Sequence, residues 1–357
     1  MKKMFKIAAV ISIAGLSLAG CSSSGDGGDG GDEAAGFKAC LVSDAGGWDD
    51  KSFNESAKDG LDKAVADLGV EDATAESKDA TDFEANVQSM VDQECDLIIG
   101  VGFSLGEAIG NAAVANPDIK FALIDSEFSE ETAGENTKAL VFNTQESAYL
   151  AGYAAAAMSK SGKVGTFGGM KIPSVTIFMD GFVDGVAKYN EDEGKNVEVL
   201  GWDKEKQEGQ FADTFDDQQV GTQIAESMVQ QGADVIMPVA GPVGFGAAEV
   251  ARGNDDVMII GVDTDWFVSS EYGDVTLTSV QKSIENAVYD TIKAASEGSF
   301  SNENYVGTMA NGGLDLAPFH DFESKLPEGL ADKIADLKAQ IAEGTITVES
   351  PSAFPVK

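Results

Sequence analysis

Histidine, arginine and cysteine are scarce in this chain of 357 residues. The sequence has one histidine, His320, one arginine, Arg252, and three cysteines. Zinc sites draw on several His and Cys ligands, and Cys–His or Ser–His nucleophiles need a suitably placed histidine. The acidic clusters Asp49–Asp50 and Glu191–Glu193 lack the alternating oxygen ligands of an EF-hand loop. We therefore expect a protein that is not an enzyme and that uses no metal and no cofactor.

Positive charge is also in short supply. The chain has 61 acidic against 24 basic residues, which gives a formal net charge of -37. Nucleic acids and anionic lipid surfaces attract Lys and Arg, so this balance argues against nucleic acid as a partner and against direct adsorption to a membrane. An acidic surface keeps a protein soluble and suits either high salt or a cell-wall environment.

The apolar segment at the N-terminus is too short for a comfortable membrane span. It covers about residues 5–18 and follows two lysines. Residues 1–20 therefore have the features of a signal peptide. Leu18-Ala19-Gly20-Cys21 looks like a bacterial lipobox, so we predict that Cys21 is lipidated and becomes the mature N-terminus. The alternative is an ordinary secretory signal in which Cys21 is incidental.

Residues 21–36 provide a polar tether behind that cysteine. The stretch Ser22–Ala35 reads SSSGDGGDGGDEAA and has no apolar mass to bury, so we expect it to be disordered. Acyl chains on Cys21 would hold the folded part at the extracytoplasmic face of the cell membrane.

The rest of the chain alternates between strand-like and helix-like patterns. Apolar runs occur at Phe37–Val42, Asp96–Val101, Lys120–Ile124, Ala139–Phe142, Lys163–Phe167, Asn196–Gly201, Ala233–Val239 and Val257–Val262, with helical spacing between them. Repeated strand–helix units predict an α/β protein with parallel sheets. The length predicts two Rossmann-like lobes with a cleft between them. An amphipathic helix at Pro327–Glu343 should pack on one lobe.

The stretch Ser43–Leu61 joins the first strand to the first helix. Loops at the carboxyl ends of parallel strands are where such sheets bind small molecules. Asp44 offers acceptors, Phe53 a flat face, and Asn54 both donors and acceptors. The alternative is an ordinary turn, in which Ser52 or Asp50 caps the helix and Phe53 packs into the core.

The order of residues in this stretch resembles the basic membrane protein family, the PnrA-like substrate-binding lipoproteins of ABC importers. The family opens with an Asp, a Gly-containing loop and D-D-K-S-F-N, here Asp44 and Asp49–Asn54. Further matches are the Gly-Gly turn and F-x-x-G-F-x-x-G at 165–185, G-V-D-x-D at 261–265, and T-S-x-x-K at 278–282. Trp266 departs from the family, which has Gln at that position.

The resemblance implies a type I periplasmic-binding-protein fold in which the chain crosses three times between the lobes. We place the crossings near Asn143–Thr144, near Asp265–Glu271 and around Tyr305–Gly313. Lobe 1 would then comprise residues 37–143 plus about 267–308, and lobe 2 residues 144–266 plus about 309–357.

The resemblance also implies a set of ligand-binding residues in the cleft. Asp125 would face a nucleobase, Phe53 and Phe211 would stack on its two sides, and Gly241 would offer a backbone contact. Phe215 is a close rival to Phe211. Asp263 and Lys282 would grip the sugar hydroxyls, because a carboxylate accepts both protons of a diol and an ammonium donates. The full predicted set is Asp44, Phe53, Asn54, Asp125, Phe211, Gly241, Asp263 and Lys282, with Trp48, Phe178 and Asp265 as weaker candidates.

The function implied by the family is a lipid-anchored solute-binding protein that captures a nucleoside, preferably a purine nucleoside, for the permease and ATPase of an ABC importer. Two alternatives stay open. One is a sensor lipoprotein of the same fold. The other is a nucleoside or glycoside hydrolase that uses Asp44 and Asp263 as paired carboxylates.

Two cysteines remain once Cys21 is assigned to lipid. Cys40 and Cys95 either form a disulfide outside the cell or are two small buried apolar residues.

Overall fold

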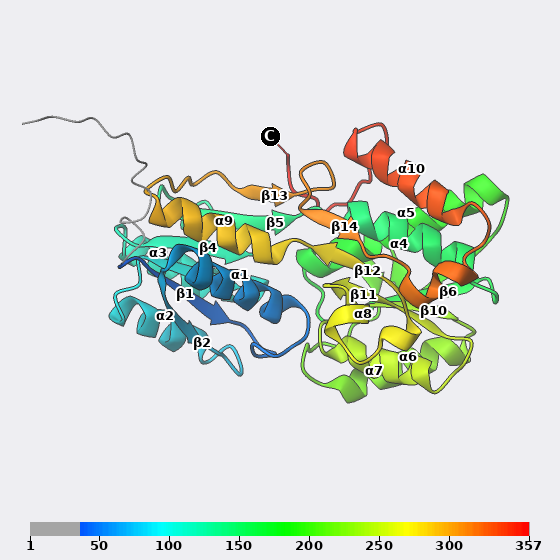
Figure 1. Ribbon diagram of the computed structural model, residues 1–357. Helices are drawn as coiled ribbons and strands as arrows, with labels where there is room; N and C mark the ends of the chain where they lie inside the picture. The colour runs from blue at the N-terminus through cyan, green and yellow to red at the C-terminus, as the bar shows by residue number, and fades with distance from the viewer. Residues whose placement is uncertain (1–35, 357) are drawn as a thin grey trace, which may run out of the picture.

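The computed structural model describes residues 36–356. The predicted signal peptide, the lipidated Cys21 and the tether Ser22–Ala35 lie outside the described residues. The described chain forms two α/β lobes side by side, each built on a six-stranded sheet (Figure 1). This is the fold class that the strand–helix alternation predicted.

Lobe 1 contains a sheet in which all strands are parallel. Its order is β13-β5-β4-β3-β1-β2. The strands are β1 (Lys38–Ser43), β2 (Glu71–Ala75), β3 (Leu97–Val101), β4 (Lys120–Ile124), β5 (Thr137–Phe142) and β13 (Tyr305–Gly307).

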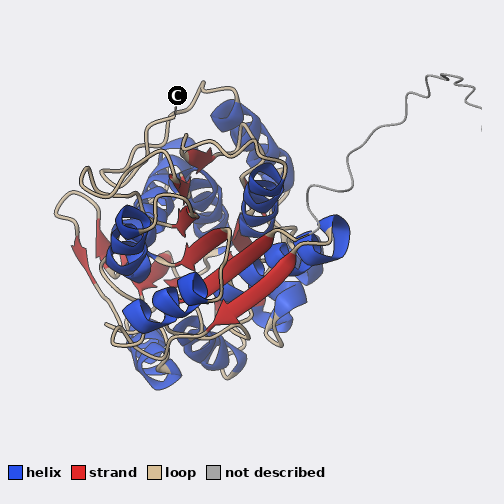
Figure 2. Cartoon of the chain, turned by 90° about the vertical axis from the view of Figure 1, so that its left-hand side faces the viewer, coloured by secondary structure: helices blue, strands red, loops and turns tan. Residues whose placement is uncertain are grey.

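Helices cover both faces of this sheet (Figure 2). The pair α1 (Phe53–Leu68) and α9 (Ile284–Ser296) packs together, as do α2 (Phe83–Asp92) and α3 (Gly106–Ala115), which follows the short 3₁₀ turn η1 (Phe103–Leu105). Successive side chains of a strand point to opposite faces. Ala39 and Leu41 accordingly join the core under α1, whereas Cys40 and Val42 join the core under α2 and α3.

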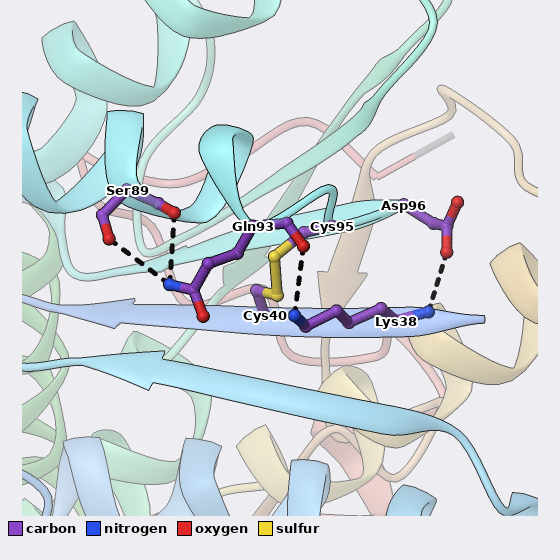
Figure 3. The surroundings of a disulfide bond; sticks show 6 residues. All are labelled: Lys38, Cys40, Ser89, Gln93, Cys95 and Asp96. Atoms are coloured by element: carbon purple, nitrogen blue, oxygen red, sulfur yellow. Dashed lines mark hydrogen bonds between the residues drawn. A yellow bond between two sulfur atoms is a disulfide. The ribbon is translucent and has the colours of Figure 1, made fainter. Parts of the chain in front are cut away.

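A disulfide bond joins Cys40 in β1 to Cys95, just before β3 (Figure 3). Next to it, the Lys38 backbone N–H donates to Asp96 Oδ2 at 2.8 Å, and Lys38 Nζ donates to the Gln93 carbonyl at 3.1 Å. Of the two interpretations of these cysteines, the structure therefore has the disulfide.

Lobe 2 contains a sheet in the order β14-β12-β11-β10-β6-β7, parallel except for β14. Its strands are β6 (Lys163–Gly168), β7 (Glu198–Leu200), β10 (Val235–Val239), β11 (Met258–Asp263), β12 (Thr276–Lys282) and β14 (Leu314–Leu316). A small hairpin, β8 (Trp202–Asp203) and β9 (Glu208–Gly209), follows β7.

Two helix pairs lie on opposite sides of the second sheet (Figure 1). One pair is α4 (Gln145–Met158) with α5 (Pro173–Glu193), and the other is α6 (Gln218–Gln230) with α7 (Val243–Arg252). Shorter elements are α8 (Trp266–Ser269), η2 (Gly273–Val275) and η3 (His320–Lys325). The predicted tail helix is α10 (Leu330–Ala342), and it packs on α4 through one apolar side.

Close contact between α4 and α5 depends on glycine. A Cβ added at Gly181 would lie 2.2 Å from the Gln145 carbonyl oxygen, and one at Gly185 would lie 1.9 Å from that of Tyr149. No side chain fits at these distances, so the glycines of F-x-x-G-F-x-x-G allow the two helix backbones to touch.

The chain crosses between the lobes three times, and the second crossing was placed wrongly from the sequence. The first lies at Asn143–Thr144, between β5 and α4, and the third lies between β13 and β14, both where predicted. The second lies at Lys282–Ser283 rather than at Asp265–Glu271, because β12 pairs with β11 and remains in lobe 2. The short elements α8 and η2 return the chain to the same sheet.

The C-terminal tail packs over the first crossing. Asn143 Nδ2 donates to the Phe354 carbonyl at 3.0 Å, and Asn143 Oδ1 accepts from the Phe354 N–H at 2.8 Å. Ser350 Oγ donates to the fully buried Asp180 at 2.6 Å. The tail is thereby fixed to both the hinge and lobe 2.

Candidate functional site

A cavity of about 560 Å³, counting some open solvent, lies between the lobes. It is bounded by segments that follow the carboxyl ends of strands in both sheets, as expected for α/β folds. The lining residues are Asp44, Ala45, Asp50, Phe53, Asn54, Gly102, Phe103, Asp125, Ile172, Ser174, Val175, Phe178, Phe215, Val239, Ala240, Gly241, Pro242, Val262, Asp263 and Lys282.

The structure brings most of the predicted site residues together in this cavity. Seven of the eight main candidates line it: Asp44, Phe53, Asn54, Asp125, Gly241, Asp263 and Lys282. Phe178, a weaker candidate, lines it as well. Phe211, Trp48 and Asp265 do not belong to the lining.

Lys282 is the central charge of the cavity. Its Nζ lies 2.5 Å from Asp125 Oδ2 of lobe 1 and 3.3 Å from Asp263 Oδ1 of lobe 2. Burial alone would lower the pKa of Lys282, but attraction to the two carboxylates outweighs this and raises the pKa above its ordinary value. The lysine is therefore a permanent ammonium that joins the two lobes.

Aromatic rings surround this ammonium. The ring centroids of Phe53 and Phe178 lie 5.0 Å and 5.1 Å from Lys282 Nζ, and that of Phe142 lies 5.8 Å away. Phe53 belongs to lobe 1 and Phe178 to lobe 2, so the cavity offers flat apolar faces from both sides next to polar groups.

The loop before α1 contains the helix cap, for which the sequence offered Ser52 or Asp50. Asp50, not Ser52, caps the helix, because its carboxylate accepts backbone N–H groups of Ser52, Asn54 and Glu55 at 2.9, 2.9 and 3.0 Å. Burial raises the pKa of Asp50 to about 6 in spite of these three hydrogen bonds.

The Ser52 side chain makes no capping hydrogen bond and instead contacts lobe 2. Its Oγ lies 3.2 Å from the Val262 carbonyl and 3.3 Å from Asp263 Oδ2. Thr264 Oγ1 donates to the Lys51 carbonyl at 3.2 Å. These direct contacts between lobes describe a closed arrangement.

Phe211 and Phe215 have different positions. Phe211 packs edge-on against Trp202, with ring centroids 5.9 Å apart, and forms a β-bridge with Gly168. Phe215 lines the cavity and packs against Gly169, where a Cβ would lie 2.3 Å from its ring. The rival candidate Phe215, not Phe211, is thus the ring that the structure presents to the cavity.

Trp48 and Asp265 have contacts elsewhere. The Trp48 backbone N–H donates to Glu76 Oε1 at 2.9 Å, and the Trp48 ring packs against the hydrophobic core. Asp265 caps α8 through the Phe267 N–H and lies 2.7 Å from Nε2 of His320. Trp266, the departure from the family pattern, is fully buried and donates its indole N–H to the Val262 carbonyl.

Some lining residues were not predicted. Phe103 follows β3, and Ile172, Ser174 and Val175 follow β6. The rule that parallel strands present ligand-binding loops at their carboxyl ends points to both segments. Local sequence chemistry did not, because these side chains are apolar or small.

Within residues 36–356, no group of three or more His, Cys, Asp or Glu is arranged to hold a metal ion. No helix in that part of the chain has the length and apolar character needed to cross a bilayer.

Comparison with families and curated proteins gives consistent matches. Residues 37–315 match the model of the family described as ABC transporter substrate-binding protein PnrA-like. The ABC transporter nucleoside-binding protein BmpA of Lactococcus lactis is 32% identical over 370 residues, covering 98% of this chain and 100% of that protein. Basic membrane protein A of Borreliella burgdorferi is 32% identical over 286 residues, covering 80% and 78%.

Solved structures match the same architecture. An ABC transporter solute-binding protein from Aeropyrum pernix K1 has a TM-score of 0.75 at 29% identity, covering 88% of this chain and 94% of that one. One from Conexibacter woesei has a TM-score of 0.69 at 21% identity, covering 88% and 99%, and supports the fold.

Proposed function

Because the chain belongs to the PnrA-like family of ABC transporter substrate-binding proteins, we propose that it captures a nucleoside between its lobes and presents it to an ABC permease. The family assignment confirms the resemblance inferred from the sequence. The protein binds its ligand without converting it, and a lipid on Cys21 holds it at the extracytoplasmic face of the membrane.

The observation that carries this proposal is the combination of aromatic faces with the Asp125–Lys282–Asp263 group in one cavity. A nucleoside has a flat ring system and a vicinal diol. Stacking on an aromatic side chain contributes about 1–3 kcal/mol per base. Charged groups form stronger hydrogen bonds to hydroxyls than neutral groups do.

Within this proposal the sugar lies beside Asp263 and Lys282. The carboxylate of Asp263 accepts hydroxyl protons, and the ammonium of Lys282 donates to the sugar oxygens. The base lies against Phe53, with Phe178 or Phe215 of lobe 2 on its other side. A purine is the preferred base because the two fused rings of a purine offer the larger area for stacking.

The charges of the cavity disfavour an anionic ligand. Asp44, Asp50, Asp125 and Asp263 line it with Lys282 as the one basic residue of the lining. A phosphate group would enter a site that already has an excess of carboxylates, so we expect nucleosides to bind and nucleotides to be rejected.

Ligand contacts in both lobes also explain how capture is coupled to closure. The lobes are joined by three chain crossings, and a ligand that touches both sides stabilises the closed arrangement relative to the open one. The closed form is the shape that a permease then recognises.

Calorimetric titration of the purified protein against purine and pyrimidine nucleosides and their 5′-monophosphates tests the proposal. Phe53→Ala and Asp263→Ala should each weaken nucleoside binding by about 1–3 kcal/mol, through lost stacking or lost charge-assisted hydrogen bonds. Asp49→Asn is the control, since the Asp49 side chain is 90% exposed and lies outside the cavity lining. Unchanged affinity in both cavity variants, or tighter binding of the monophosphates, would contradict the site or the ligand class.

A further inference from the structure

Asp44 occupies a position in the cavity where no cation of residues 36–356 forms an ion pair with it. Its backbone N–H donates to the Val101 carbonyl at 3.1 Å, which fixes the residue where β1 and β3 end. Its side chain lines the cavity beside Gly102, where an added Cβ would lie 2.0 Å from Asp44 Oδ2.

The charged groups that face Asp44 are negative on three sides. Asp50 precedes α1, Asp125 follows β4, and Asp216 comes from lobe 2 before α6. The nearby ammonium of Lys282 is already held between Asp125 and Asp263. Burial, followed by these three carboxylates, raises the pKa of Asp44 well above its ordinary value, against an opposing hydrogen bond from Asn54.

Asn54 supplies a second, independent sign of a ligand contact. The residue is 2% exposed and lines the cavity, and its Oδ1 has no hydrogen-bond partner among the described residues. Its Nδ2 is directed to the Ala45 carbonyl at 3.4 Å. A buried acceptor without a partner is costly, so a ligand donor at this place would stabilise the closed form.

The Asp44 carboxyl and the Asn54 amide therefore lie side by side in the cavity. The protonation state of Asp44 decides which pattern of donors and acceptors on a ligand the two groups can bind. With an ionised Asp44 the pair would present acceptors alone, which suits a ligand edge with two donors. With a protonated Asp44 the pair presents one donor and one acceptor. Nucleobase edges commonly place an acceptor beside a donor, as in N7 and the N6 amino group of adenine.

On the basis of the proposed function, we propose that Asp44 carries a proton in the complex and donates it in a hydrogen bond to a ring acceptor of the nucleoside, while Asn54 Oδ1 accepts from a neighbouring donor. The proton comes from solvent, so the cavity takes up an uncharged ligand together with a proton wherever Asp44 of the free protein is ionised. Asp44 is in this sense a residue that determines specificity.

The direction of the pH dependence follows from this arrangement. A bound ligand displaces water and accepts from the acid, so the pKa of Asp44 is higher in the complex than in the free protein. Affinity is then greatest at pH values below the pKa of the free protein. It falls as the pH rises above that value, by up to about tenfold per pH unit, and levels off above the pKa of the complex.

The test is calorimetric titration with adenosine, inosine, guanosine and uridine from about pH 5 to about pH 9, where a strongly raised carboxyl titrates. Each pH is measured in two buffers of different ionisation enthalpy, which reports the protons taken up. For the wild-type protein we expect proton uptake and an affinity that falls with rising pH.

Three variants separate Asp44 from its neighbours. Asp44→Asn keeps a donor at the position, so we expect it to bind without proton uptake and with an affinity that no longer varies with pH. Asp263→Asn should lose affinity but keep proton uptake, because it removes a carboxylate that contacts Lys282 and accepts from the sugar in the proposed complex. Asp49→Asn makes the same substitution at an exposed site of the same loop and should keep the wild-type pH dependence.

The outcomes distinguish this inference from the proposed function. If the wild-type protein binds none of the nucleosides at any pH, the proposed function fails. If it binds one with no proton uptake, or if Asp44→Asn retains the wild-type pH dependence, the nucleoside assignment stands and the role of Asp44 is wrong. Retained dependence would point to Asp50 or Asp125, the two other carboxyls of the lining whose pKa is raised by burial.

Discussion

Two phenylalanines four residues apart have separate tasks in this protein. Phe211 fills space between Trp202 and Gly168, whereas Phe215 lies against Gly169 at the cavity. The adjacent glycines Gly168 and Gly169 leave room for both rings. This arrangement gives each ring a different expected effect on binding.

We predict that Phe215→Ala weakens nucleoside binding by about 1–3 kcal/mol, since it removes a ring available for stacking. Phe211→Ala should leave the affinity close to that of the wild-type protein and lower the melting temperature instead, because it opens a gap beside Trp202. Titration calorimetry and thermal unfolding of the same two samples give both quantities. A large loss of affinity in Phe211→Ala alone would reverse the assignment of the two rings.

At the residue scale, the residues that a motif of fixed spacing pointed to gather at one cavity, and their part in ligand binding stays a prediction. Asp44, Phe53, Asn54, Asp263 and Lys282 come from crisp family motifs, and all of them line the cavity. Phe211 belongs to a segment that matches the family pattern less closely. A shift of four residues in that match exchanges Phe211 for Phe215, the ring that lines the cavity. The local sequence does not show that the Ser52 side chain contacts lobe 2 and makes no capping hydrogen bond. That contact, from Ser52 Oγ to the Val262 carbonyl, joins residues 210 positions apart.

Among the described helices, α4 and α5 have the closest packing. The two helices approach so closely that carbonyl oxygens of α4 lie against the glycine Cα atoms of α5. Phe178, at the start of the same helix α5, lines the cavity. The glycine contacts therefore help to set the position of a ring that lines the cavity.

Gly185→Ala should destabilise the protein by about 1–3 kcal/mol, since the new methyl group forces the helices apart. Gly253→Ala is a matched control. Gly253 has φ -80°, and a Cβ there would have no atom closer than 3.5 Å, so the change should be neutral or slightly stabilising. Chemical denaturation of both variants measures the difference, and equal free energies of unfolding would contradict the packing argument.

For strands with continuous apolar runs, the ends were predicted to within a few residues. Polar strands at the edge of a sheet were not predicted. The edge strand β2 reads EDATA and is largely exposed, so it lacks the apolar pattern of a buried strand. The segment between β11 and β12 was assigned the second crossing on the basis of the resemblance to type I periplasmic binding proteins. Its return to the same sheet depends on pairing between β11 and β12 and on the buried Trp266, which are tertiary effects.

The whole molecule combines two lobes, a predicted tether and a predicted anchor. Residues 1–35 lie outside the described part of the chain, so the anchor follows from the Leu18-Ala19-Gly20-Cys21 motif alone. The net charge of -37 gives the protein little attraction to an anionic membrane surface, so charge alone would not hold it there.

We expect Cys21→Ser to abolish lipid attachment and to release the protein from the membrane fraction, because stable anchoring depends on acyl chains. Metabolic labelling with a fatty acid, followed by fractionation, measures both effects. The Cys40→Ser Cys95→Ser double variant is the control for loss of cysteine, and it should still be labelled. Labelling that persists in Cys21→Ser would show that another residue is modified.

The two hydrogen bonds between the Asn143 side chain and the Phe354 backbone have a practical consequence for experiments with this protein. They bring the C-terminal end of the described chain to the first hinge crossing (Figure 1). A purification tag or fluorescent protein fused there would sit beside the pivot of the two lobes and disturb their motion. The same proximity makes a small dye at this end a sensitive reporter of the closing that ligand binding is expected to cause.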